Sequence, residues 1–186
     1  ASSAPFRFFK GYPTEGGIRA PFFIRYQGLG RTGVTTARAH VSDVMPTLLD
    51  LAGGQRLETN HGKPALPFDG MSCARMFLEG EASPRIEQYY ECWSNRAYYR
   101  NGWLARSLQV RGAPINMDNW TLHNLGEDFS ESTDLANKYP QKLKELVEAF
   151  DGAAWKHFVY PLDNRSRPGK FSDVPQWMRE RANEAK

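Results

Sequence analysis

The chain has 186 residues, of which 40% are hydrophobic and 24% charged, with a formal net charge of +3. This length and composition are those of one ordinary soluble globular domain with a real core. The small charge argues against nucleic acid as a partner, and the basic residues gather most closely at Arg165, Arg167 and Lys170. No apolar run approaches the roughly 20 residues of a membrane span. We therefore expect neither nucleic acid nor a membrane as a partner.

The two ends and the cysteines give little information on the compartment. The start, Ala-Ser-Ser-Ala-Pro, lacks the basic and apolar regions of a signal peptide and has no methionine. We expect the chain to begin inside a longer polypeptide. Cys73 and Cys92 are too few for a disulfide framework, and neither has a Cys or His at metal-ligand spacing. Two free, partly buried thiols are expected, with a single bridge as the alternative.

The first elements are read from short apolar patterns. Alternation at Phe6 and Phe8 favours a brief strand, and residues 18–26 predict a buried strand. Gly16 and Gly17 can take backbone angles that other residues avoid, so the chain can turn sharply ahead of that strand. Lys10 would then lie on a loop held by a rigid scaffold, where binding groups concentrate.

A helix is expected after Ser42 or Asp43, either of which can cap it. Pro46 falls in its first turn, where a missing N–H removes no helical bond. The helix is almost wholly apolar, which predicts burial against a sheet. His40, which precedes it, is read as a hydrogen-bonded structural histidine rather than a catalytic one.

The second half of the chain is typical of antiparallel β-structure with a covering helix. A long surface loop over residues 55–70 and a short helix over 72–78 precede strands at 88–93, 96–100, 103–110 and 120–125. Asn101-Gly102 supplies the two positive φ angles of a type I′ turn. Pro140 starts an amphipathic helix that should cover one face of the sheet. A last short helix is expected over residues 174–181.

Several stretches resemble one family. Lys10-Gly11, then Glu15-Gly16-Gly17-Ile18-Arg19 and Pro21, looks like the second signature of the sulfatases. Further likenesses follow in the family's order at residues 40–53, 69–72, 95–103 and 120–136. The series runs in register from about Lys10 to the helix near Phe158, and it is most similar to bacterial-type arylsulfatases.

The resemblance implies a fold and a domain division. The class is α/β, seen in this chain as α+β. Residues 1–83 would be the end of the large alkaline-phosphatase-like sulfatase domain. Residues 84–160 would form a small antiparallel β subdomain with a packed helix, and residues 161–186 an extended tail.

The resemblance also implies sulfate ester hydrolysis. In that family the nucleophile is a formylglycine made from a C/S-x-P-S-R motif, and a calcium ion is held by Asp and Asn oxygens. Charge builds up on the ester and sulfuryl oxygens, and preplaced cations stabilise it. Lys10 matches the family lysine that contacts the sulfate, so it is the candidate catalytic and substrate-binding residue. Glu15, Gly16, Gly17 and Arg19 are read as supports for the loop.

The departures from the family pattern are as informative. The sequence has no C/S-x-P-S-R motif, and Ser72-Cys73-Ala74-Arg75 lacks the proline and the second serine. No Asp-Asn pair precedes Lys10, and Asp118-Asn119 lies too far downstream to be carried over. Calcium and formylglycine are therefore expected only in the full-length protein, and this chain alone is expected to be inactive. The expected partners are a sulfate ester and the rest of the sulfatase domain, and the resemblance favours a periplasmic or secreted protein.

Two alternatives stay open. The chain could be a non-catalytic binding module derived from a sulfatase, its apolar surfaces marking a partner site. Trp93, Trp103 and Trp120 could stack on sugars, although core packing is favoured. A complete small hydrolase is disfavoured because no nucleophile motif accompanies the four histidines. Asn119 and Asn164 begin glycosylation sequons, a pattern too common to establish secretion.

Overall fold

The computed structural model describes residues 3–29 and 32–164. The chain divides into two compact units, one made of Ala1–Pro21 with Glu87–Lys186 and the other of Phe22–Ile86. We call them the sheet unit and the helical unit. The predicted helix over residues 174–181 and the basic residues near Arg165 lie outside the described residues. The three predicted domains remain a prediction.

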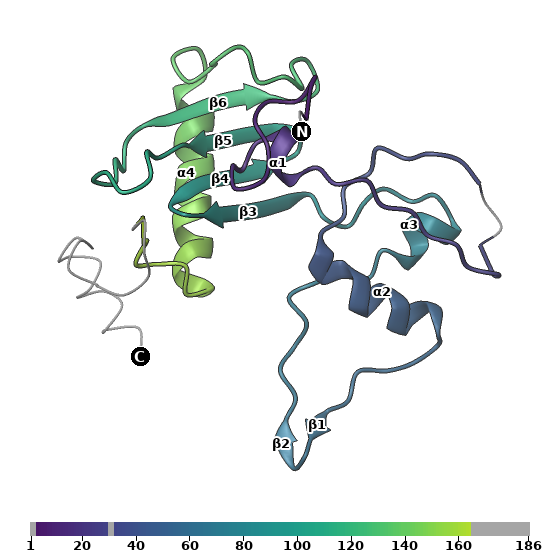
Figure 1. The fold of residues 1–186 in the computed structure, drawn as a ribbon. Helices are drawn as coiled ribbons and strands as arrows, with labels where there is room; N and C mark the ends of the chain where they lie inside the picture. The colour runs from purple at the N-terminus through teal and green to yellow at the C-terminus, as the bar shows by residue number, and fades with distance from the viewer. Residues whose placement is uncertain (1–2, 30–31, 165–186) are drawn as a thin grey trace. The chain divides into compact units, whose positions relative to one another are not determined.

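The sheet unit is built on an antiparallel sheet in the order β3-β4-β5-β6 (Figure 1). Its strands are β3 (Glu87–Cys92), β4 (Asn95–Arg100), β5 (Trp103–Ser107) and β6 (Trp120–Asn124). Asn101 and Gly102 take φ angles of 48° and 86°, which confirms the turn between β4 and β5. The third predicted strand is shorter than expected, because it ends at Ser107 rather than at Val110.

One face of this sheet packs on α4 (Pro140–Lys156), which contacts all four strands (Figure 1). Apolar side chains spaced at helical intervals form a single stripe on α4, as predicted. The buried core joins that stripe to the sheet and to the segment after the helix: Tyr98, Ala105, Leu122, Leu146, Phe150, Ala154, Tyr160 and Leu162. The expected α+β arrangement and the covering helix are therefore confirmed.

The other face of the sheet is also buried. Side chains alternate along a strand, so the neighbours of the core residues point away from α4. Four of them are at most 5% exposed: Ala97, Leu104, Arg106 and His123. The segment that contains α1 (Glu15–Ile18) lies on this side of the sheet, opposite α4 (Figure 1). The sheet is therefore enclosed between α4 and the N-terminal segment.

The helical unit contains η1 (Val41–Asp43), α2 (Val44–Leu51), α3 (Ala74–Leu78) and a small hairpin of β1 (Thr59–Asn60) with β2 (Lys63–Pro64). The helix after Asp43, with Pro46 in its first turn, and the short helix near residue 74 are confirmed. The predicted long loop carries the hairpin, both of whose strands are exposed.

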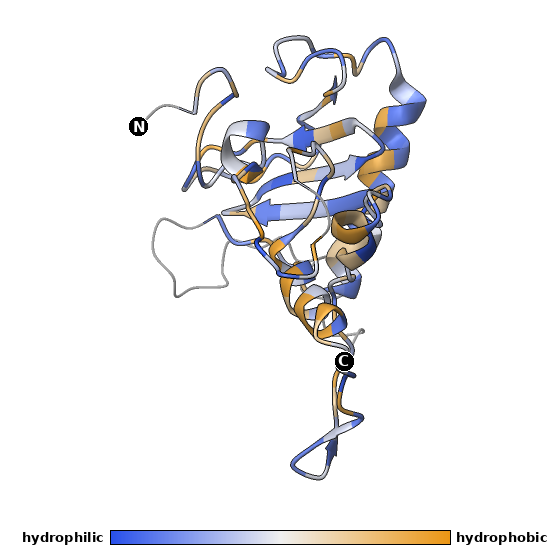
Figure 2. Ribbon diagram, turned by 90° about the vertical axis from the view of Figure 1, so that its right-hand side faces the viewer, coloured by the Kyte–Doolittle hydropathy of each residue, from blue (hydrophilic) through white to orange (hydrophobic). Residues whose placement is uncertain are grey.

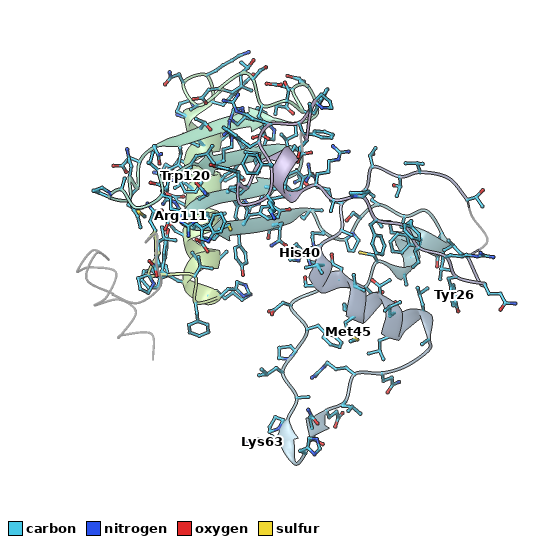
Figure 3. All side chains as sticks on the ribbon, viewed as in Figure 1. Tyr26, His40, Met45, Lys63, Arg111 and Trp120 are labelled. Carbon is cyan, nitrogen blue, oxygen red and sulfur yellow. The ribbon has the colours of Figure 1, made fainter. Side chains whose placement is uncertain are left out.

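The apolar surface of α2 is the first departure from the sequence-based predictions. The helix is mostly hydrophobic, whereas α4 is divided into polar and apolar stripes (Figure 2). Its expected burial against a sheet is wrong for the described residues: Leu48 is 53% exposed and Met45, labelled in Figure 3, is 60% exposed. Among its residues only Thr47 is buried. The apolar pattern is present, but no described sheet covers it.

The strands predicted at the N-terminus are the second departure. Residues 15–18 form α1, residues 19–26 form neither helix nor strand, and Phe6 and Phe8 lie in turns and bends. Phe22 and Phe23 are 62% and 92% exposed, so the expected burial is also wrong. A strand needs a neighbour to pair its backbone groups, and no described strand pairs with this run.

In the part of the chain that the structure describes, every helix is too short or too polar to cross a membrane.

His123 is a buried titratable group on β6. Its Nδ1 lies 2.8 Å from the carbonyl oxygen of Thr133, and its Nε2 lies 3.0 Å from Thr121 Oγ1. The carbonyl can only accept, so Nδ1 carries the hydrogen and Nε2 accepts from the hydroxyl. Burial, with Arg106 nearby, lowers the pKa of His123 from 6.5 to about 4. The ring is therefore neutral in the folded protein at neutral pH.

This predicts a stability that falls in acid. Between pH 6.5 and about 4 the unfolded chain binds a proton at His123 that the folded chain does not. The free energy of unfolding should therefore fall as the pH drops through this window, by up to about 3 kcal/mol. Urea unfolding of wild type and His123→Asn at several pH values measures it. The free energy of unfolding of the variant should lack this part of the pH dependence. Parallel pH dependences for the two proteins would show that the folded ring is charged in this window.

Candidate functional site

Lys10 is exposed on a loop of the sheet unit, as predicted. The next residue, Gly11, has a φ of 93°, a left-handed angle that favours glycine. The carbonyl oxygen of Gly11 accepts a hydrogen bond of 3.1 Å from Asn95 Nδ2, at the start of β4. Asn95 Oδ1 in turn accepts from the backbone N–H of Gln109 at 2.8 Å. One buried asparagine thus ties the Lys10 loop to the sheet.

Trp93 is the second contact of this loop. A Cβ placed on Gly11 would lie 2.7 Å from Trp93 Cζ3, so only glycine lets the loop approach the ring this closely. The guanidinium carbon of Arg111 lies 4.7 Å from the centre of the same ring. Trp93 and Arg111 are thereby brought beside the residue that follows Lys10.

The glycine pair supports the loop in a different way from the one expected. Gly16 and Gly17 are part of α1 and neither has a positive φ, so the predicted sharp turn is wrong. Their missing side chains matter instead, because a Cβ would lie 2.3 Å from Arg7 O at Gly16 and 1.9 Å from Tyr12 O at Gly17. Thr14 Oγ1 also donates to Arg7 O, at 2.7 Å. The pair lets the segment fold back on itself.

Glu131, in the turn after β6, anchors this folded segment to the sheet. Its Oε1 accepts from the backbone N–H of Glu15 at 2.7 Å, and its Oε2 lies 2.8 Å from Arg106 Nε on β5. Glu131 is 1% exposed and Arg106 is 5% exposed. Burial raises the pKa of Glu131, although the N–H of Glu15 and the charge of Arg106 act against it. Burial likewise lowers the pKa of Arg106.

Glu15 and Arg19 form an ion pair within the signature segment. Arg19 Nη1 lies 3.1 Å from Glu15 Oε2, across α1. The carboxylate is buried while the arginine side chain is 44% exposed. The guanidinium also lies 5.0 Å from the centre of the Phe6 ring. Glu15 and Arg19 therefore act as supports of the loop, as predicted.

Two further stretches of the family resemblance meet in the helical unit, around Asp43. Its carboxylate accepts from the backbone N–H groups of His40 and Met71, at 2.8 and 2.9 Å, and from Arg85 Nε at 2.7 Å. Burial would raise the pKa of Asp43, but the hydrogen bonds of Arg85 and of the two N–H groups lower it overall. A Cβ on Gly70 would lie 1.9 Å from Ser42 O, so the second stretch fits against the first only with glycine there.

His40 has the structural role that was favoured. Its Nδ1 accepts from the backbone N–H of Ser42 at 3.3 Å, and Asp43 closes the same turn as a capping box. Burial lowers the pKa of His40, with a further contribution from the charge of Arg85. The neutral ring therefore holds the start of η1.

The remaining candidate groups are structural. Cys73 is a buried free thiol and Cys92 a half-buried one, as expected. Asn119 Nδ2 donates to Leu108 O at 2.6 Å, and Asn164 Nδ2 donates to Val110 O at 2.8 Å. Both sequon amides are thus engaged within the fold, which disfavours glycosylation at either position.

Residues 3–29 and 32–164 do not fit a metal ion, because nowhere do they bring together three His, Cys, Asp or Glu side chains that could hold one. Asp118-Asn119, the one acidic-amide pair weighed from the sequence, serves a loop: Ser107 Oγ donates to Asn119 Oδ1.

Sequence reasoning missed the residues that hold the site together. Glu131 and Asn95 fall only within the family-like stretches 120–136 and 95–103, and Arg106 only within a predicted strand. Each acts through a partner far away in the sequence, so no local pattern identifies it. The single hint was an acidic residue placed among serines after a strand, which many surface turns share.

This anchoring generates a prediction about Glu131. Glu131→Gln keeps an acceptor for the N–H of Glu15 but leaves the charge of Arg106 buried without a partner. The free energy of unfolding should fall by about 3–5 kcal/mol, and amide exchange at Glu15 should quicken. Urea unfolding and hydrogen exchange measure the two effects.

Glu145→Gln is the matched control. Glu145 pairs with Arg100 and Lys142 in exposed positions, where such pairs contribute about 0–1 kcal/mol. Equal losses in the two variants would contradict the anchoring role of Glu131.

Comparison with curated proteins confirms the family resemblance. An uncharacterized sulfatase of Schizosaccharomyces pombe is 29% identical over 160 residues, covering 80% of this chain and 27% of that protein. An arylsulfatase of Hemicentrotus pulcherrimus is 33% identical over 97 residues, covering 52% of this chain and 16% of that protein. A sulfatase of Formosa agariphila is 25% identical over 162 residues, covering 76% of this chain and 27% of that protein. No family model matches the chain.

Solved structures show a partial likeness. Ps i-CgsB matches with a TM-score of 0.46 and 22% identity, covering 67% of this chain and 26% of that one. BT4656, solved in complex with its substrate D-glucosamine-2-N,6-O-disulfate, matches with a TM-score of 0.43 and 16% identity, covering 64% and 24%. This chain spans only about a quarter of these proteins. The curated relatives of this chain are thus sulfatases, and the chain corresponds to a part of their length.

Proposed function

We propose that this chain is the C-terminal part of a sulfuric ester hydrolase of the arylsulfatase type, and that Lys10 contacts a sulfuryl oxygen of the substrate. The chain would contribute the end of an alkaline-phosphatase-like domain together with the small antiparallel sheet. The observation that carries the proposal is the anchored signature segment, which Glu15 and the glycine pair fix in place. The relatives of the chain are sulfatases.

The chemistry asks for a cation in a fixed place. In sulfate ester cleavage, negative charge grows on the bridging oxygen and is spread over the sulfuryl oxygens. An ammonium group stabilises this charge most when it needs no reorganisation. The loop of Lys10 is held at Gly11 by Asn95 and Trp93 and at Glu15 by Glu131. Such a loop can present its lysine with little conformational freedom in the backbone.

The rest of the machinery would come from the remainder of the polypeptide. The formylglycine nucleophile needs a C/S-x-P-S-R motif, and this sequence has none. The calcium ion would likewise be held by residues outside this chain. Lys10 would therefore act on a sulfate that other parts of the full-length enzyme bind and attack.

The exposed apolar side chains of the helical unit also support a larger assembly. Leu48 and Met45 on α2 are more than half exposed, as are Phe22 and Phe23 ahead of it. The favoured occupant of this surface is the rest of the sulfatase domain. The same surface supports the second candidate, a non-catalytic binding module whose partner is another protein. A C/S-x-P-S-R motif in the polypeptide encoded upstream would decide for the enzyme.

The purified chain should release no nitrophenol from para-nitrophenyl sulfate, with or without added calcium, because it lacks the nucleophile. The assay is the absorbance of the product against a buffer blank. Calcium-dependent hydrolysis by the chain alone would overturn the proposal that the nucleophile lies elsewhere.

In the full-length enzyme, Lys10→Ala should lower kcat/KM for an aryl sulfate by about 100-fold to 1000-fold, because a preplaced cation at the developing charge is lost. Lys144→Ala is the matched control, since this exposed lysine lies on α4. Steady-state kinetics of both variants measures the effect. An unchanged kcat/KM in Lys10→Ala would remove Lys10 from the active site.

A further inference from the structure

Trp93 is unusual for a side chain of its size. It is 51% exposed, and it follows β3 with a φ of 53°, in the left-handed region. Ser94 next to it has a φ of 63°. Two successive non-glycine residues in this region require the surroundings to hold them. Glu91 Oε1 does so by accepting from the N–H of Ser94 at 2.7 Å.

The indole ring is fixed on two sides. Gly11 lies so close that even a methyl group there would collide with the ring. Arg111 lies over the ring, 4.7 Å from its centre. The ring is nevertheless half exposed, so part of its surface remains in contact with solvent. Trp93 thus offers a rigid aromatic surface beside the residue that follows Lys10.

More aromatic rings flank Lys10 in the sequence, at Phe8, Phe9 and Tyr12. Phe8 stacks on Tyr12 at 4.9 Å between ring centres, and Phe9 meets Tyr12 edge-on at 5.5 Å. Phe8 is 39% exposed and Phe9 is 53% exposed. Lys10 therefore follows two exposed phenylalanines in the sequence and precedes a glycine packed on Trp93. A cation among exposed rings fits a ligand that has both an anionic group and a ring.

This inference rests on the proposed function of Lys10. We propose that Trp93 is a specificity-determining residue that stacks on the ring carrying the sulfate ester, so that the site prefers cyclic sulfates to open-chain ones. The cyclic group is an aryl ring or a sugar ring, whose flat faces cover an indole better than a short alkyl chain does. The sulfate of the same molecule would then reach toward the Lys10 loop.

The test measures how strongly three sulfates inhibit the hydrolysis of para-nitrophenyl sulfate by the full-length enzyme: phenyl sulfate, a glucosamine O-sulfate and ethyl sulfate. The inhibition constants should be about threefold to tenfold lower for at least one cyclic sulfate than for ethyl sulfate, as expected for one ring–ring contact. The comparison of phenyl and glucosamine esters shows which ring is preferred.

The variants separate the ring from the anion. Trp93→Asn should abolish the preference for cyclic sulfates, measured against ethyl sulfate in the same variant; asparagine tolerates the left-handed angle, so the turn should persist. Trp93→Phe should keep part of the preference. Lys10→Ala should weaken the binding of all three sulfates by the same factor. Phe158→Ala, which removes an aromatic side chain that is 81% exposed, should change nothing.

The two ideas fail in different ways. If Lys10→Ala in the full-length enzyme binds all three sulfates as wild type does, the proposed role of Lys10 is wrong and the inference falls with it. If Lys10→Ala weakens binding while wild type shows no preference for cyclic sulfates, Trp93 does not stack on the ring of the substrate. The same follows if Trp93→Asn keeps that preference while Phe158→Ala has no effect. In that case the indole merely packs against Gly11.

Discussion

The buried carboxylate of Glu131 is the interaction on which the candidate site depends. In its described part, from residue 3 on, the N-terminal segment forms no strand with the sheet, so backbone ladders cannot fix its position. One carboxylate supplies the link instead, by accepting the N–H of Glu15 and lying against Arg106 on β5. An isolated buried charge would be very unfavourable, and the pairing offsets that desolvation. The position of the Lys10 loop is therefore set by polar contacts over a sheet that α4 has already closed on its other face.

The loop is held at two separate points, and this has a consequence for its function. Asn95 and Trp93 hold Gly11 just after Lys10, and Thr14 Oγ1 holds Arg7 O before it, in the segment that Glu131 anchors. A backbone fixed on one side only could still swing, whereas one fixed on both sides leaves mainly the lysine side chain free to move. Side-chain freedom costs much less to restrict than loop freedom does. A lysine on such a base can meet an anion with a small entropic loss, which is what binding and transition-state stabilisation both need.

Local signals in the sequence predicted the elements whose structure is decided locally. The Asn101-Gly102 turn, the antiparallel strands and the amphipathic stripe of α4 each follow from a few neighbouring residues, and all are confirmed. The predicted strand at residues 18–26 failed because pairing needs a partner that no local pattern specifies. The glycine pair was correctly singled out, but for the wrong property: close approach to Arg7 and Tyr12 matters, not a positive φ. Glu131 was missed because its role exists only through distant partners.

The same reasoning explains why the two units differ so much in what they leave exposed. The sheet unit buries both faces of its sheet, using α4 on one and the N-terminal segment on the other. The helical unit is ordered mainly by the polar contacts of Asp43, which fix its turns without covering α2. The apolar pattern of α2 thus predicts burial, but residues 3–29 and 32–164 do not bury the helix. On the proposed function, the remaining three quarters of a sulfatase would bury it, since this chain spans only 27% of its Schizosaccharomyces pombe relative. On that proposal, the apolar pattern of α2 reflects a partner that the described residues do not include.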